Sequence, residues 1–343
     1  MLISEFDYDL PEELIAQEPL EKRANSRMLA VNRAEKSFSD EHFFDFPKFL
    51  KKGDVVVLNN TKVFPARLFG ATETGAKVEI FLVREVENSV WETLARPAKR
   101  LKVGRKIVFN EKLSATVLEK SEDGKVFVEF EANGDFDAIL DEIGKTPLPP
   151  YIKRKKDEKD QDRERYQTVF AQKRGAIAAP TAGLHFTPEI LAEIKNIGAE
   201  IAEITLHVGY GTFEPVRVND LSEHRVLPER YEILPETAEI LNKAKAESRR
   251  IIAIGTTTTR TLEAAINENG KTKAGKDFAN LTITPGYKFK IINGILTNFH
   301  LPQSSLLVLT STFGGHELII KAYNYAVHEK YRFYSYGDCM LII

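Results

Sequence analysis

An amide, an imidazole and two hydroxyls stand close together in residues 297–307 (TNFHLPQSSLL), between two apolar runs. Imidazole exchanges a proton near neutral pH, and amide and hydroxyl groups hold polar substrates in place. Residues 294–296 are typical of the end of a buried strand, and Pro302 is suited to the first turn of a following helix. We therefore expect Asn298 and His300 to lie at the carboxyl end of a strand, where open α/β sheets bind ligands.

Three further segments repeat this build, with small, hydroxyl or imidazole residues directly after an apolar run. They are residues 180–187 (PTAGLHFT), 206–215 (LHVGYGTFEP) and 255–263 (GTTTTRTLE). A single polar side chain at a strand end is commonly a structural cap, but four such edges of one sheet can line one pocket. The repetition therefore predicts a ligand site.

Taken together, the four segments closely resemble the S-adenosylmethionine:tRNA ribosyltransferase-isomerase family of queuosine biosynthesis. The resemblance continues over nearly the whole chain, in residues 6–19 (FDYDLPEELIAQEP), 26–27 (SR), 59–67 (NNTKVFPAR), 165–169 (RYQTV) and 331–338 (YRFYSYGD). Long, ordered and scattered motifs are far more specific than a single glycine fingerprint. The chain departs from the family mildly, with Asn60 where aspartate is usual and Leu227 where a histidine is frequent.

The resemblance implies a reaction that consumes S-adenosylmethionine as a ribosyl donor. The ribosyl part is transferred and isomerised onto the aminomethyl group of 7-aminomethyl-7-deazaguanine at the tRNA wobble position, which gives epoxyqueuosine and releases adenine and methionine. The implied partner is tRNA carrying that base, and we expect no metal and no obligate protein partner. A proton must leave the carbon beside the sulfonium, and the attacking amine must be uncharged, so a base that works near neutral pH is required.

Histidine meets that requirement, and three histidines belong to the four segments: His185, His207 and His300. Glu214 is a fourth candidate, either as the base or as a partner of the ribose hydroxyls. The residues alone leave the choice among these four open.

Hydroxyl, aromatic and charged side chains of the same segments are candidates for binding the donor. Residues 256–259 are four threonines between a strand and a helix, and hydroxyls and N–H groups at a helix start suit a carboxylate or a ribose. Arg260 is the candidate partner of the methionine carboxylate, and aromatic faces suit the sulfonium or adenine. The candidate substrate-binding residues are Tyr166, Thr181, Gly209, Thr256, Thr257, Thr258, Thr259, Arg260 and Asn298.

A formal net charge of −2 requires any RNA-binding surface to be local, because phosphate contacts normally come from lysine and arginine. Basic residues cluster within residues 22–27, 99–106 and 153–156, and the alternative for each cluster is a solvated face. The candidate tRNA-binding residues are Arg67, Lys99, Arg100, Lys102 and Arg105, with Arg67 either contacting RNA or bridging two domains.

Short strands with alternating polar and apolar residues dominate from about residue 53 to residue 131, beginning with residues 55–58. Turns rich in glycine and asparagine separate them, and both residues tolerate a positive φ. The pattern predicts a small antiparallel barrel, which is either a structural insert or a nucleic-acid platform. A short helix over residues 135–143 and the prolines within residues 147–150 mark its exit.

Helices and strands alternate after the barrel, which is the rhythm of a mostly parallel sheet. Thr187 is the expected N-cap of one helix, Pro235 begins a second, and residues 261–267 form a third. The charged run of residues 153–165 is expected to be a mobile loop, either disordered or ordered only when ligand binds.

These patterns predict an α/β and β fold with two domains. Residues 1–60 and 148–343 are expected to form the larger α/β catalytic domain, with a mostly parallel sheet. Residues 61–147 are expected to form an inserted small antiparallel β-barrel domain.

Composition narrows the class of protein. No apolar run approaches the ~20 residues of a membrane-spanning helix, and the first residues lack a basic start followed by an apolar core. The single cysteine, Cys339, can form neither an internal disulfide nor a cysteine-based zinc site, which fits a cytoplasmic protein.

Two other function classes stay open at this point. A methyltransferase that uses the same donor on RNA would need a glycine loop followed by a helix, which the segment around Gly209 lacks. A non-catalytic RNA-binding protein built on the barrel would not explain why four polar strand ends occur in the larger domain.

Overall fold

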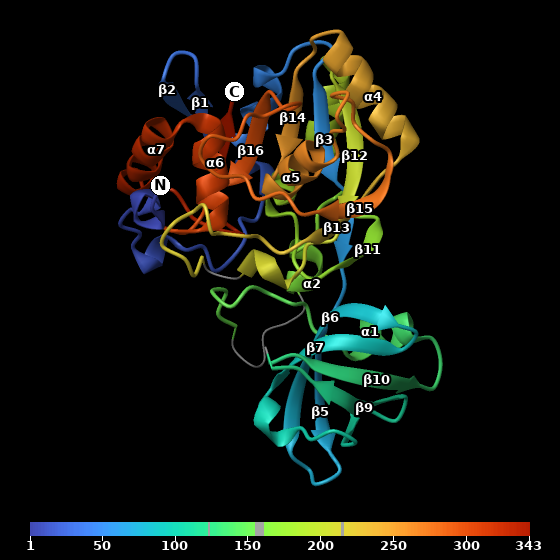
Figure 1. Cartoon of the computed structure of the whole chain (residues 1–343). Helices are drawn as coiled ribbons and strands as arrows, with labels where there is room; N and C mark the ends of the chain where they lie inside the picture. The colour runs from blue at the N-terminus through green and yellow to red at the C-terminus, as the bar shows by residue number, and fades with distance from the viewer. Residues whose placement is uncertain (123, 155–160, 214–215) are drawn as a thin grey trace.

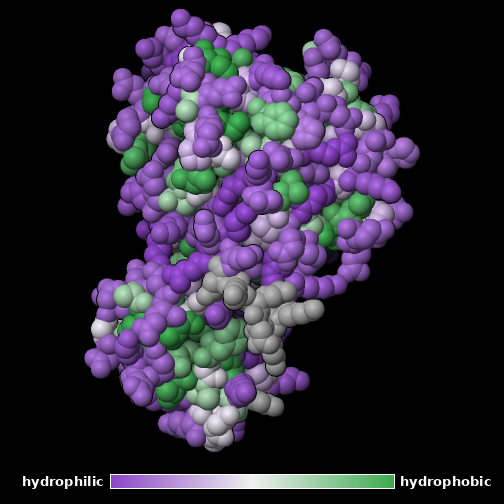
Figure 2. Space-filling model, turned by 180° about the vertical axis from the view of Figure 1, so that it is seen from behind, coloured by the Kyte–Doolittle hydropathy of each residue, from purple (hydrophilic) through white to green (hydrophobic). Residues whose placement is uncertain are grey.

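The computed structural model describes residues 1–122, 124–154, 161–213 and 216–343. The larger domain holds both chain termini, and the barrel extends from one end of it (Figure 1). Viewed from behind, the surface of the larger domain is mostly hydrophilic (Figure 2). None of the helices in the described ranges is long and apolar enough to cross a membrane.

Within the described residues, nine strands form one sheet, in the order β15-β13-β12-β3-β14-β16-β17-β1-β2. Their bounds are β1 Arg27–Asn32, β2 Ser37–His42, β3 Val55–Asn59, β12 Glu200–Leu206, β13 Glu229–Ile233, β14 Ile251–Ile254, β15 Gly275–Ala279, β16 Gly294–Asn298 and β17 Cys339–Ile342. The four central strands, β12, β3, β14 and β16, run parallel. Most flanking pairs are antiparallel, so the sheet is mixed and its parallel part lies at the centre.

Alternation along the central strands explains the two layers that cover the sheet. Val55 and Val57 of β3 belong to a core shared with α4 (Pro235–Ala246), α5 (Thr256–Ala264), α6 (Ser305–Gly314) and α7 (His316–His328). Val56 and Leu58 face the opposite core, which α3 (Pro188–Asn196) and η4 (Phe43–Phe49) cover. Such strands are buried on both faces, as their apolar runs require.

The helix starts agree with the sequence at some positions and differ at others. Thr187 caps α3 as predicted, because its Oγ1 accepts from the Ile190 N–H. The third helix, α5, begins at Thr256 rather than at residue 261, so the threonines form its first turns. Helix α6 begins at Ser305, because Ser304 is the residue whose hydroxyl accepts from the Leu307 N–H.

A closed antiparallel barrel follows β3, and in the described residues it has six strands in the order β10-β7-β6-β5-β8-β9. The strands are β5 Arg67–Thr72, β6 Lys77–Glu87, β7 Val90–Arg96, β8 Lys106–Val108, β9 Leu113–Lys120 and β10 Val126–Ala132. Residues 55–58, the first strand of the predicted run, belong instead to the large sheet, as β3. Helix α1 (Phe136–Ile143), capped by Asp135, packs on the barrel core through Ile139 and Leu140.

The chain enters and leaves the barrel at one place. Arg67 and Lys145 exchange two backbone hydrogen bonds of 3.2 and 2.8 Å. Just before the entry, β4 (Thr61–Val63) pairs in parallel with β11 (Lys173–Ala176) of the larger domain. The rings of Phe81 on β6 and Tyr210 form a further contact, with centroids 6.4 Å apart. The barrel is therefore an insertion with side-by-side ends.

Shorter helices connect these elements: η1 Ile3–Phe6, η2 Glu12–Leu14, η3 Arg23–Asn25, η5 Ala98–Arg100, η6 Thr181–His185, η7 Tyr210–Phe213 and α2 Gln161–Arg165. Helix α2 occupies the end of the charged run that was expected to be a mobile loop. Its order follows from Asp162, which accepts hydrogen bonds from Arg154 and from the Tyr336 hydroxyl. Residues 155–160 of that run lie outside the described residues.

Candidate active site

All four polar segments contribute to one cavity at the carboxyl ends of the central parallel strands. It encloses about 600 Å³, including the open solvent at its mouth. Val208 follows β12, Gly255 follows β14, and Asn298 ends β16, so the position is the one that open α/β sheets use for ligands. The predicted residues that line it are Tyr166, Thr181, Thr256, Thr257, Asn298 and His300.

Asn298 lines this cavity and is 2% exposed. Its Nδ2 donates to the Tyr334 carbonyl at 3.0 Å and lies 3.3 Å from His185 Nε2. Its Oδ1 is buried and accepts no hydrogen bond from the described residues. A buried acceptor without a partner costs free energy of about 1–3 kcal/mol, so a ligand N–H or O–H that reaches it is stabilised.

His185 lies behind Asn298, outside the cavity lining. Its Nδ1 is 2.7 Å from Ser26 Oγ, and Ser26 Oγ donates onward to the Arg23 carbonyl. Because Asn298 donates to Nε2, the hydrogen bonds assign the imidazole proton to Nδ1. Burial, with a smaller effect of two arginines, lowers the pKa of His185 to about 4. Both ring nitrogens are therefore used by protein partners, and the ring is neutral.

His300 lines the cavity directly. Its ring Nε2 lies 2.8 Å from Thr297 Oγ1, its backbone N–H donates to the Tyr323 hydroxyl, and its backbone carbonyl accepts from the Tyr8 hydroxyl. Burial lowers the pKa of His300 to about 3, so this ring is also neutral at working pH. Its Nδ1 has no hydrogen-bond partner among the described residues.

His207 lies apart from the other two histidines, just beyond β12. Its Nδ1 is 2.8 Å from Thr61 Oγ1, and Gly175 approaches the ring so closely that a Cβ there would lie 2.7 Å from it. Burial and the nearby Arg230 lower the pKa of His207. The structure does not bring His207 to the cavity, and Glu214 lies outside the described residues.

The four threonines of α5 divide into two pairs. Thr256 and Thr257 line the cavity, and Thr257 Oγ1 is buried without a partner in the described part of the chain. Thr258 and Thr259 donate their hydroxyls to the carbonyls of Ile254 and Gly255, four residues earlier, at 2.7 and 3.1 Å. The second pair is fully buried, and its hydroxyls bond to the backbone at the start of α5 instead of facing the cavity.

Arg260 forms a buried ion pair with Glu229 and does not line the cavity. Its guanidinium also donates to the carbonyls of Leu227, Ala279 and Leu281. Gly209 joins the same cluster, since its N–H donates to Glu229 Oε1 at 3.1 Å. The structure thus places Arg260 and Gly209 in a structural network beside the site.

Sequence reasoning missed two aromatic walls of the cavity, Tyr151 and Tyr334, and the hydroxyl of Ser335. The Tyr151 and Tyr334 rings meet edge to face with centroids 3.9 Å apart, and Tyr151 Oη is 2.5 Å from Ser335 Oγ. Burial raises the pKa of Tyr334 to about 12 and that of Tyr151 well above its usual value. These phenols are therefore neutral donors. Residues 334 and 335 lie in the motif 331–338, which was the available signal.

The candidate RNA-binding residues lie on the barrel. Arg67 pairs with Glu79 at 2.8 Å. Lys99 and Lys102 are exposed, on the connection between β7 and β8, and Arg105 is half-buried and contacts Thr74 Oγ1. The backbone of Arg100 ends η5, and its side chain is outside the described set.

Comparison with known proteins agrees with this architecture over the full chain. A family model described as queuosine biosynthesis protein matches residues 3–342. Two proteins named S-adenosylmethionine:tRNA ribosyltransferase-isomerase, from Syntrophotalea carbinolica and Desulfitobacterium hafniense, are 49% and 48% identical to this chain. Each comparison covers 100% of both chains.

A solved structure supports the same assignment. The crystal structure of S-adenosylmethionine tRNA ribosyltransferase from Thermotoga maritima is 35% identical, with a TM-score of 0.57, and the match covers 99% of this chain and 100% of that one. This chain, with its α/β sheet, its inserted barrel and the cavity that the four segments line, therefore belongs to the queuosine biosynthesis protein family.

Proposed function

We propose that this chain is a transferase that moves the ribosyl moiety of S-adenosylmethionine onto tRNA and isomerises it. The acceptor is the aminomethyl group of 7-aminomethyl-7-deazaguanine at the wobble position, the tRNA product carries epoxyqueuosine, and adenine and methionine are released. The observation that carries the proposal is the full-length identity of 48–49% to enzymes named for this activity.

The cavity has the chemistry that a cationic donor with a ribose requires. The neutral rings of Tyr166, Phe299 and Tyr334 offer aromatic faces to a sulfonium. Asn298 Oδ1 and Thr257 Oγ1 are buried groups without partners in the described residues, and both suit ribose hydroxyls. We propose that these residues hold the donor.

His300 is our first candidate for the base that removes the proton beside the sulfonium. It is the one of the three proposed histidines that lines the cavity, and its Nδ1 is free of protein partners within the described residues. A neutral imidazole is in the protonation state that a base needs. Its depressed pKa makes it a weaker base in the buried site than in water, but the sulfonium acidifies the proton that it must accept.

The partner is tRNA, and the protein works where tRNA is modified, which places it in the cytoplasm. We propose that the barrel contributes to the RNA surface through Lys99, Lys102 and Arg105, together with Arg67 at the junction. No obligate protein partner and no metal are required by this scheme.

The proposal is tested by product analysis. Purified protein, S-adenosylmethionine and tRNA bearing the aminomethyl-deazaguanine should yield epoxyqueuosine in digested tRNA, with one adenine and one methionine released per modified tRNA. Formation of S-adenosylhomocysteine would instead identify a methyltransferase. Binding of tRNA without any turnover of the donor would identify a non-catalytic RNA-binding protein.

A further inference from the structure

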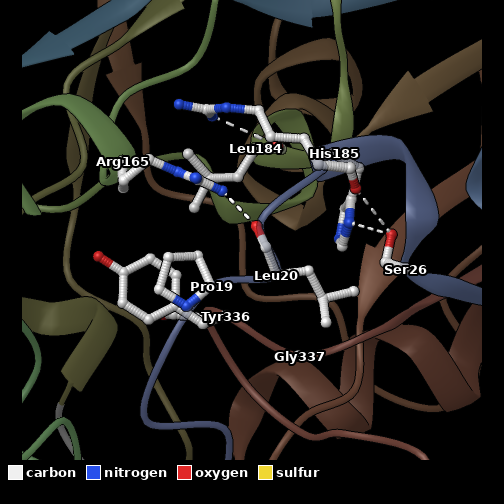
Figure 3. A pocket seen from close by; sticks show the side chains of 10 residues that line it. Pro19, Leu20, Ser26, Arg165, Leu184, His185, Tyr336 and Gly337 are labelled. Carbon is white, nitrogen blue, oxygen red and sulfur yellow. Dashed lines mark hydrogen bonds between the residues drawn. The ribbon is translucent and has the colours of Figure 1, made fainter. Parts of the chain in front are cut away.

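A second, smaller hollow adjoins the cavity on the far side of His185. It encloses about 320 Å³ with its open mouth, and Ser335 lines both hollows. Pro19, Leu20, Leu184 and Tyr336 supply apolar walls. The side chain of Arg165 lies beside Leu184 and points toward Leu20, and His185 and Ser26 lie on the other side of the view (Figure 3). Arg23 is a second guanidinium in the lining.

The two guanidiniums are anchored by backbone carbonyls. Arg23 donates to the carbonyls of Gln167, Leu184 and Glu164, and Arg165 donates to those of Glu21 and Leu20. A guanidinium carries five N–H donors, so both side chains retain unused donors. One of them, Arg165 Nε, is buried and has no partner in the part of the chain that the structure describes.

Neither cation forms an ion pair with a described residue. Burial, and to a smaller extent the charge of Arg165, lowers the pKa of Arg23. Glu164, which forms no ion pair with Arg23, partly offsets this decrease. A third guanidinium, Arg332, acts electrostatically on His185, and its Nη1 is also buried without a partner among the described residues. Partly buried like charges without a counter-ion favour a bound anion.

This arrangement differs from that of several other basic residues of the protein. Arg67, Lys106 and Arg174 each contact a carboxylate, at 2.8, 2.6 and 2.8 Å. The hollow at Arg23 and Arg165 is therefore suited to phosphate, which guanidinium groups bind through paired N–H donors.

We propose that Arg23 and Arg165 bind one phosphodiester of the RNA substrate, next to the nucleotide whose base enters the cavity. The inference rests on the proposed function for the identity of the substrate. The hydrogen-bonded path from Ser26 through His185 to Asn298 joins the phosphate subsite to the wall of the cavity. A phosphodiester bound in the hollow thus fixes the position of the neighbouring nucleobase relative to the cavity.

A double-mutant cycle between protein and RNA tests this subsite. The probes are anticodon stem-loop RNAs in which single phosphodiesters around the wobble position are replaced, one at a time, by uncharged methylphosphonate. For the unaltered protein, one position should weaken binding by about tenfold or more, as expected for a charge-assisted contact. Arg165→Gln should weaken binding of the natural RNA similarly and should be insensitive to methylphosphonate at that position.

Arg33→Gln is the matched control, because the Arg33 side chain also donates only to carbonyls, those of Phe313 and Asn293, and lines neither the cavity nor the smaller hollow. It should keep the wild-type sensitivity at every position. Arg165→Lys keeps the positive charge, so it should recover part of the RNA affinity that Arg165→Gln loses. Such recovery would show that the loss comes from the missing charge and not from a folding defect.

Two results would overturn the subsite. If methylphosphonate substitution weakens RNA binding equally in the unaltered protein and in Arg165→Gln, Arg165 does not contact that phosphate. A loss of S-adenosylmethionine affinity with unchanged RNA affinity assigns the hollow to the donor carboxylate instead. Because binding is measured without turnover, failure of the proposed reaction is seen separately, in the products formed by the unaltered protein.

Discussion

At the scale of single residues, the chemistry of the site depends on partners far away in the chain. The ring of His185 contacts Ser26, 159 residues away, and the backbone carbonyl of His300 accepts from Tyr8, 292 residues away. The sequence predicts that imidazoles occur at strand ends, because that pattern is local. Which of these imidazoles lines the cavity depends on how distant strands and loops pack together, so the choice among the histidines required the structure.

Substitution of His300 by glutamine should lower kcat by roughly 10²–10⁴-fold and leave donor affinity within a few-fold. The reason is that the variant retains an amide for polar contacts but has no group that accepts the proton. Because the pKa of His300 is lowered to about 3, the wild-type rate should show no loss from protonation of this residue between pH 5 and 8.

The exposed His328, whose Nδ1 contacts Glu329, offers the control His328→Gln, which should keep normal kinetics. Steady-state kinetics at several pH values measure kcat and its pH dependence, and pre-steady-state binding experiments measure the donor affinity. A near-normal rate in His300→Gln would rule this histidine out as the base, and Glu214 would become the next residue to substitute.

At the scale of elements, α5 shows where a local pattern is insufficient. Four consecutive threonines after a strand were expected to precede a helix over residues 261–267, but the helix begins at Thr256. Their division into a cavity-lining pair and a buried pair could not be predicted from the sequence, because all four residues are identical and the helix begins earlier than expected. Once Thr256 is the first residue, the hydroxyls of Thr258 and Thr259 reach carbonyls four residues back.

Two neighbouring substitutions on α5 should separate binding from stability. Thr257→Val removes an unpaired buried hydroxyl in the cavity wall, so donor affinity should fall by about tenfold while thermal stability is unchanged or higher. Thr258→Val removes a helix hydrogen bond outside the lining, so stability should fall by about 1 kcal/mol with donor affinity retained.

Isothermal titration with S-adenosylmethionine and thermal melts of both variants measure these effects. The reverse assignment, with weak donor binding only in Thr258→Val, would show that the second pair of threonines contacts the ligand.

At the scale of the whole molecule, alternation of strand and helix predicted the α/β domain, and short turns predicted the barrel. The antiparallel flanks of the sheet were not predicted, because β13, β15 and β17 pair with strands that are distant in sequence. We propose that residues 61–147 form a separable unit, since Arg67 and Lys145 bring its ends together.

Charge reversal at Lys102 and Arg105 tests the barrel as part of the RNA surface. The double variant should bind tRNA more weakly, and each lost phosphate contact should reduce the slope of log affinity against log salt by about 0.9. Donor affinity should not change. Reversal at Lys271 and Lys273, exposed lysines of the α/β domain, is the control. An unchanged affinity and salt slope in the barrel variant would remove these residues from the RNA surface.

The central claim is that the ribosyl group, and not the methyl group, of the donor reaches the tRNA. The most direct measurement uses S-adenosylmethionine labelled with different isotopes in its methyl and ribose carbons, together with tRNA carrying the aminomethyl-deazaguanine. Ribose label should enter the tRNA in equal amount to the adenine released, and methyl label should leave entirely as free methionine. Methyl label retained in the tRNA, with S-adenosylhomocysteine in solution, would contradict the account.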